Sequence, residues 1–197
     1  METEWAHVGR LWTNGDPFLA IDSELRHLWR GFSDDAYFDQ IVELPLDTQH
    51  VTLGDAVAAV VGADGVVRDD SWVEVFEAAD GTIAVVQAAG DDYRRALDDA
   101  LRYPDAGDDV GALIAVPSGQ LAIFSAACDG AGEHSMALEP ARRGNPPAEH
   151  GPPSREADPG LVLTTGVASY RLKIRWYTEI DDSSCFARWL LLPEPPA

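Results

Sequence analysis

The clearest pattern of apolar and polar positions lies in residues 71–101, which read SWVEVFEAADGTIAVVQAAGDDYRRALDDAL. Two apolar, β-branched stretches are separated by Asp80 and Gly81, a pair that favours a tight hairpin turn of type I′. Beyond this hairpin the spacing changes, and apolar positions that begin at Tyr93 recur at helical intervals between charged ones. The pattern therefore predicts a strand, a turn, a second strand and then a helix over residues 91–103.

The remainder of the chain reads as short apolar strands separated by turns. The expected strands are residues 5–12, 18–21, 37–44, 51–53, 57–61, 110–116, 120–126, 161–165, 170–178 and 185–192. A short helix is expected at residues 24–29, and hairpin turns are expected at residues 64–65 and 117–119. The stretch at residues 129–160 is rich in proline and glycine and poor in large apolar residues, so it is interpreted as a mobile insertion loop.

Together these elements predict a single α+β domain over residues 1–197. The expected fold is a largely antiparallel, strongly twisted β-sheet with one main helix packed on a face and a short N-terminal helix. Hydrophobic residues make up 46% of the 197 residues, which is enough to build a core.

Charge is the most unusual feature of the composition. There are 34 acidic and 14 basic residues, and the formal net charge is −20. A surface of this kind repels nucleic acids and anionic membranes and attracts basic proteins, although acidity can also serve solubility alone. The N-terminus lacks the pattern of a signal peptide, and no apolar run approaches ~20 residues, so a cytoplasmic protein without a spanning helix is expected.

No motif in the sequence predicts an enzyme, a cofactor site or a metal site. The five histidines are scattered, the two cysteines, Cys128 and Cys185, lie far apart, and the aspartate pairs lack the spacing of a calcium loop. Cys128 with His134 could form a nucleophilic pair, but a small apolar role for the thiol is the simpler interpretation. The basic positions Arg171, Lys173 and Arg175 are interpreted as charge balance across strands rather than as a nucleic-acid face.

Several short motifs in a fixed order carry a family resemblance. They are NGDPFL at 14–19, EL at 24–25, HLWRG at 27–31, DAYFD at 35–39, TLGD at 52–55, SWV at 71–73 with the helix at 93–101, GQLAIFSA at 119–126, YRLKIR at 170–175 and RWLLLP at 188–193. In this order they resemble the immunity protein 21 family of bacterial polymorphic toxin systems. Asp16 stands where that family has a glycine, and the insertion after Asp129 is longer than in the family. The C-terminal half also resembles the competence nuclease inhibitor family.

The resemblance implies a non-enzymatic protein that binds and neutralises a cognate toxin domain. The acidic charge suits a basic toxin such as a nuclease. The partner-binding residues expected from exposed acidic turns and aromatics are Asp34, Asp35, Tyr37, Asp69, Asp70 and Trp72. Tyr37 and Trp72 could instead belong to the core, and a small hydrolase or ligand-binding domain assembled from distant Ser, His and Asp residues is the alternative function.

Overall fold

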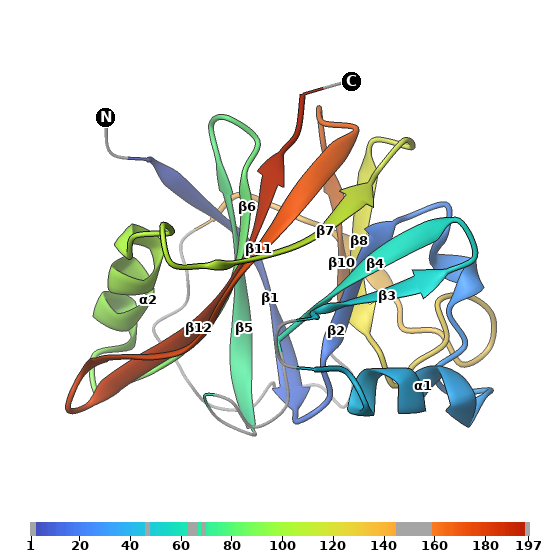
Figure 1. Ribbon diagram of the computed structural model, residues 1–197, viewed down its shortest axis with the longest axis horizontal. Coiled ribbons are helices and arrows are strands. Elements are labelled where there is room, and N and C mark those ends of the chain that lie inside the picture. Colours follow the sequence, from blue (N-terminus) through green and yellow to red (C-terminus); the bar gives the residue numbers. More distant parts are fainter. Residues whose placement is uncertain (1–2, 46–47, 63–66, 68–69, 145–158, 196–197) are drawn as a thin grey trace.

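A computed structural model describes residues 3–45, 48–62, 67, 70–144 and 159–195. Two six-stranded sheets pack face to face (Figure 1). The first sheet has the order β1-β5-β6-β12-β11-β7, with bounds Trp5–Asn14, Asp70–Ala78, Ile83–Ala89, Ser184–Pro193, Ser169–Asp181 and Asp109–Ala115. The second has the order β3-β4-β2-β8-β10-β9, with bounds His50–Leu53, Ala56–Val61, Phe18–Asp22, Gln120–Ser125, Gly160–Thr164 and Leu138–Pro140.

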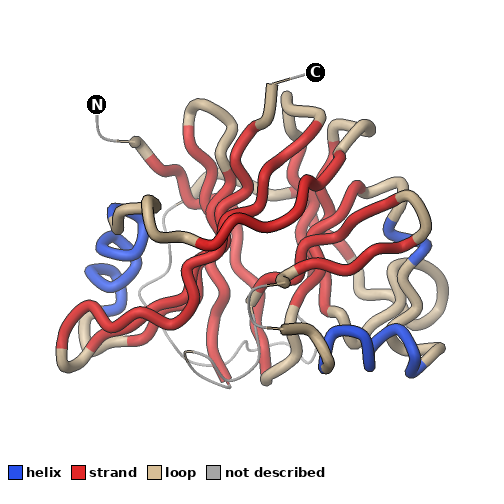
Figure 2. The backbone as a smooth tube through the Cα atoms, viewed as in Figure 1, coloured by secondary structure: helices blue, strands red, loops and turns tan. Residues whose placement is uncertain are grey.

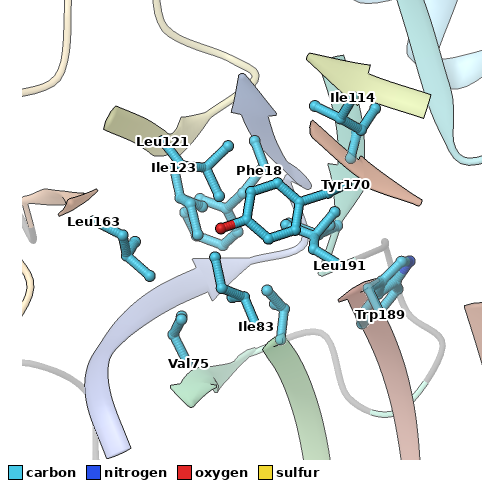
Figure 3. Close-up of a cluster of buried hydrophobic side chains, with 14 of the residues drawn as sticks. Phe18, Val75, Ile83, Ile114, Leu121, Ile123, Leu163, Tyr170, Trp189 and Leu191 are labelled. Atoms are coloured by element: carbon cyan, nitrogen blue, oxygen red, sulfur yellow. The ribbon is translucent and has the colours of Figure 1, made fainter. Parts of the chain in front are cut away.

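The central core lies between the two sheets (Figure 3). Strand β5 contributes Val75 from the first sheet, and β2 and β8 contribute Phe18 and Ile123 from the second. Their sequence neighbours point the other way, because successive side chains of a strand alternate between faces. Both faces of these strands are therefore buried, which explains why they read as continuous apolar runs rather than as clean alternations.

Each outer face has its own cover. Helix α2 (Tyr93–Arg102) lies on the outer side of the first sheet, where it buries Tyr93, Leu97 and Ala100 against Phe186. Helix α1 (Asp35–Val42) lies against the outer side of the second sheet, over a cluster that contains the fully buried Trp29. The tube view shows how little of the molecule is helical (Figure 2).

The predicted α+β class and the largely antiparallel pairing are confirmed, with one difference in the arrangement. The strands form two sheets, because the residues expected to form a hairpin around 117–119 separate at this point. Strand β7 pairs with β11 in the first sheet, whereas β8 pairs with β2 and β10 in the second. The connection is anchored by Asp22, whose carboxylate accepts a hydrogen bond from the Ser118 backbone N–H at 2.8 Å.

Residues 37–44 were expected to form a strand, and this prediction is wrong. Asp34 caps a helix there, with its side chain accepting a hydrogen bond from the Ala36 backbone N–H. The apolar residues Tyr37, Ile41 and Leu44 recur at intervals of four and three, which is the helical period. The short helix expected near residues 24–29 is a single 3₁₀ turn at Arg26–Leu28.

The turn at residues 80–81 also differs from its prediction. A type I′ turn needs positive φ at both central residues, but only Gly81 has it, with φ 86°. The Gly81 N–H instead donates to the Ala78 carbonyl at 3.0 Å, as in a type I turn followed by a left-handed glycine. The hairpin expected at residues 64–65 lies outside the described residues.

The described part of the proline-rich stretch, residues 129–144 and 159–160, packs against both sheets. Strand β9 lies within it and pairs parallel with β10. The segment then returns to β1, where the Arg142 N–H donates to the Val8 carbonyl at 2.9 Å. Residues 145–158 lie outside the described part of the chain.

Candidate functional site

Helix α1 and the segment before it form an exposed acidic face. No residue of α1 is buried, although Tyr37, Phe38 and Ile41 pack partly against the Trp29 cluster. The ring of Tyr37 meets that of Trp29 edge to face, at 5.5 Å between centroids. The helix is therefore held by one partly buried side, and its other side is available to a partner.

The exposed side of α1 carries a row of three carboxylates. Asp35, Asp39 and Glu43 follow one another at intervals of four residues, and all three are exposed. Side chains at this spacing lie next to each other on a helix, and like charges there are destabilising. Glu43 also caps the C-terminal end, where negative charge is unfavourable, and the last turn has no basic residue to compensate.

Two large apolar side chains near this acidic row are also exposed. Phe32, just before the helix, is 58% exposed, and Val42, in its last turn, is 71% exposed. The ring of Phe32 lies 4.3 Å from that of His134, measured between centroids. Acidic rims around apolar side chains are a frequent arrangement at protein–protein interfaces.

Asp129 fixes the segment that leads into α1. Its carboxylate is buried and accepts hydrogen bonds from the backbone N–H groups of Phe32 and Ser33, at 3.0 and 2.9 Å, and from the Ser33 hydroxyl. Burial raises the pKa of this carboxyl, but the hydrogen bonds from Ser33 and Phe32 together lower it by more. The pKa therefore lies below its usual value. The role of Asp129 was not visible in the sequence, because its partners lie almost a hundred residues away.

A groove of about 390 Å³ runs beside α1, between the helix and the turn that joins β1 to β2. The groove is lined by Asn14, Gly15, Asp16, Pro17, Phe38, Ile41, Val42, Leu44, Gln49, Val60 and Trp176. Most of these groups are apolar, and Asp16 is the carboxylate among them. The side chain of Gln49 is buried, and its Oε1 atom has no hydrogen-bond partner among the described residues.

The structure brings together some of the residues expected to bind a partner. Asp34, Asp35 and Tyr37 share α1, although Asp34 also serves as its cap. Asp70 is exposed and pairs in register with Asn14, which lines the groove.

Trp72 and Asp69 do not join this group. Trp72 was expected as an exposed aromatic, but it is buried against Trp12 at 5.1 Å between ring centroids, with Arg10 over its face at 4.1 Å. The core interpretation is therefore the correct one for Trp72. Asp69 lies outside the described residues.

The basic stripe on β11 is used within the molecule, as the sequence predicted. Arg171 pairs with Glu194 at 3.0 Å, Lys173 with Asp105 at 2.7 Å, and Arg175 with Asp108 at 2.6 Å. Because these cations are neutralised by neighbours, the stripe offers little positive charge to a nucleic acid.

A buried carboxylate on β5 is the strongest candidate for catalytic chemistry. Glu74 is fully buried and accepts hydrogen bonds from His7 Nε2 at 2.7 Å, from Tyr93 Oη at 3.0 Å and from Arg10. Burial raises its pKa, but the bonds from His7 and Arg10 and the Arg10 charge outweigh burial, so the pKa lies below its usual value. Burial and the nearby Glu74 charge raise the pKa of Tyr93 well above its ordinary range.

This cluster connects β1, β5 and α2. His7 lines a cavity of about 630 Å³, but no serine or cysteine among the described residues lines it. Both oxygens of Glu74 already accept from the three donors, so the carboxylate has little capacity left for a substrate. The cluster therefore ties β1 and α2 to β5.

Other site types receive no support from the described residues. Within them no group of three His, Cys, Asp or Glu side chains is placed to hold a metal ion. Cys128 and Cys185 are both free, and burial raises the pKa of the Cys128 thiol. None of the helices in the described ranges has the length and apolar content needed to cross a membrane.

Comparison with known proteins gives no information about the function. No family model, curated protein or solved structure matched this chain.

Proposed function

We propose that this chain is an immunity protein that binds a cognate toxin domain and neutralises it, and that the toxin is basic, as many nucleases are. The observation that carries the proposal is the row of exposed carboxylates at Asp35, Asp39 and Glu43. The fold does not need the whole row, because its neighbouring members repel one another and Glu43 opposes the helix dipole at the C-terminal end, although Asp35 in the first turn suits that dipole. A cationic partner would remove both costs.

The remaining charges favour the same surface. Four arginines and the lysine of β11 are paired with carboxylates that lie outside α1, so they do not offset the acidic face of that helix. The net charge of −20 gives a field that speeds encounter with a basic protein. Four residues of helix rise about 6 Å, so the row can present carboxylates in series where a nuclease would otherwise hold phosphates.

The experiment is a co-expression rescue with the effector domain encoded next to this chain, supported by a binding assay. The variant Asp35→Lys, Asp39→Lys and Glu43→Lys is compared with a control, Asp55→Lys, Asp91→Lys and Asp109→Lys, which alters exposed carboxylates outside α1. Each set changes the net charge by six, from −20 to −14. We expect the α1 variant to lose rescue and to weaken binding by a hundredfold or more, at about 1 kcal/mol or more per reversed charge.

The control set should keep rescue, and its association rate should fall only modestly through the reduced net charge. The α1 variant should unfold at a urea concentration close to that of the wild type. Its three lysines repel one another much as the carboxylates did, and Glu43→Lys gains at the C-terminal end of the helix about what Asp35→Lys loses at the N-terminal end. Equal loss of rescue and binding in both variants would show that only the net charge matters and not the position of the carboxylates. Full rescue by the α1 variant would refute the proposal. Binding that does not change between ~50 mM and ~500 mM salt would exclude electrostatic steering.

A further inference from the structure

We infer that the groove beside α1 is a socket for a single arginine side chain projecting from the partner. The inference rests on the proposed function, because it supplies the residue with which a basic toxin would engage this face. It begins from Gln49, whose side chain is 4% exposed and whose Oε1 atom has no hydrogen-bond partner among the described residues. A buried acceptor without a donor is costly and is rare in folded proteins.

The chemistry of the groove matches a guanidinium better than other groups. Its walls include Phe38 and Trp176, and flat aromatic faces attract arginine by stacking and by cation–π contact. The lining residues also include Asp16, which has a carboxylate, and Gln49, whose amide oxygen is closed to solvent. An arginine has an apolar stem for the walls and five N–H donors for these two acceptors, whereas a purely apolar side chain would leave Gln49 unpaired.

The place of the groove also favours a cationic occupant. Ile41 and Val42, which line it, belong to the same helix as the exposed carboxylates Asp35 and Asp39. A cation drawn to that row therefore arrives next to the groove. Gln49 Oε1 is closed to solvent, so the arginine must displace groove side chains to reach it, and α1 has no buried residue to hold them in place.

The test uses a short peptide with one arginine, acetyl-Gly-Arg-Gly-amide, and 5-fluorotryptophan-labelled protein. The six tryptophans give separate fluorine NMR signals, and Trp176→Phe identifies the signal of the groove. We expect the peptide to shift the Trp176 signal in a saturable manner at millimolar concentration. Peptides with norleucine or citrulline in place of arginine should shift it much less, because they lack the charged donors.

Two substitutions separate the role of the amide oxygen from general effects on the surface. Gln49→Met keeps the volume and removes the acceptor, so the arginine peptide should bind about tenfold more weakly while the norleucine peptide is unaffected. Gln40→Met is the control, because Gln40 is exposed on α1 and donates to the Ala36 carbonyl at 3.0 Å. An unchanged affinity in Gln49→Met, or equal binding of the norleucine peptide, would overturn the inference.

The same variants distinguish this inference from the proposed function. If Gln49→Met weakens the arginine peptide but the effector domain never binds, the socket holds and the immunity function fails. If the effector domain binds in a salt-dependent manner and Gln49→Met leaves both its affinity and that of the peptide unchanged, the immunity function holds and the socket fails.

Discussion

The buried carboxylate of Glu74 allows the sharpest test of how this fold is held together. Glu74→Ala removes the acceptor shared by His7, Arg10 and Tyr93 and leaves these three donors without it. Breaking a buried ion pair from one side costs about 3–5 kcal/mol, because the remaining charge has no partner. Arg10 keeps some contact with water, since its side chain is 16% exposed, so a value near the lower end of that range is expected.

Urea unfolding followed by tryptophan fluorescence measures this loss. With a slope of about 2 kcal/mol per molar urea, the midpoint should fall by about 1.5–2.5 M. Glu77→Ala is the matched control on the same strand, because Glu77 pairs with Arg143 at 3.3 Å and the arginine is 70% exposed. That pair should contribute less than about 1 kcal/mol. Equal midpoints for the two variants would refute the view that the Glu74 cluster stabilises the fold.

The contribution of Glu74 to stability has a defined pH dependence, which a second variant, Glu74→Gln, can measure. The folded-state pKa of Glu74 lies below its ordinary value of 4.5, so its contribution is fully present above that value and is lost as the pH falls through the folded-state pKa. The difference in unfolding free energy between wild type and Glu74→Gln should therefore be large at pH 7 and should shrink below about pH 4. The groups that face Glu74 are His7 and Arg10 on β1 and Tyr93 on α2. A difference that grows on acidification would contradict this account.

Two further predictions concern the packing around α2 and the loops near α1. Arg188→Met should lower the unfolding free energy by about 3 kcal/mol, because Arg188 donates to the carbonyls of Ala100 and Tyr103 and to Asp108. The control, Arg171→Met, removes one partner of a half-exposed ion pair and should cost less than about 1 kcal/mol in the same urea assay. Gly130→Ala should prevent normal folding, because the new Cβ would lie 1.7 Å from the Arg26 carbonyl oxygen. In the control, Gly54→Ala, the new Cβ meets open space, and the unfolding free energy should fall by only about 1 kcal/mol because the residue has a φ of 64°. Soluble yield and circular dichroism would check both glycine variants, and a well-folded Gly130→Ala protein would contradict the packing described for this loop.

The part of the site that lies on α1 shows how a local pattern can be misinterpreted. Asp34 and Asp35 were recognised as exposed acidic residues, but residues 37–44 were taken for a strand, so the row that includes Asp39 and Glu43 was not seen. The helical spacing of Tyr37, Ile41 and Leu44 was available as a signal, and it was outweighed by the aromatic and β-branched residues that favour strands. Gln49 and Trp176 could not be assigned to the same groove from sequence, because folding alone brings them together.

The sequence by itself determined the features that depend on near neighbours. The two strands joined through Asp80 and Gly81, the helix that follows them and the strand at residues 170–178 were predicted, because turn chemistry and side-chain period act within a few residues. Only the tertiary structure decided how the strands divide between two sheets and which buried polar groups meet. Strands buried on both faces carry no alternation to show which neighbour they pair with, so their partners are selected by packing across the whole chain.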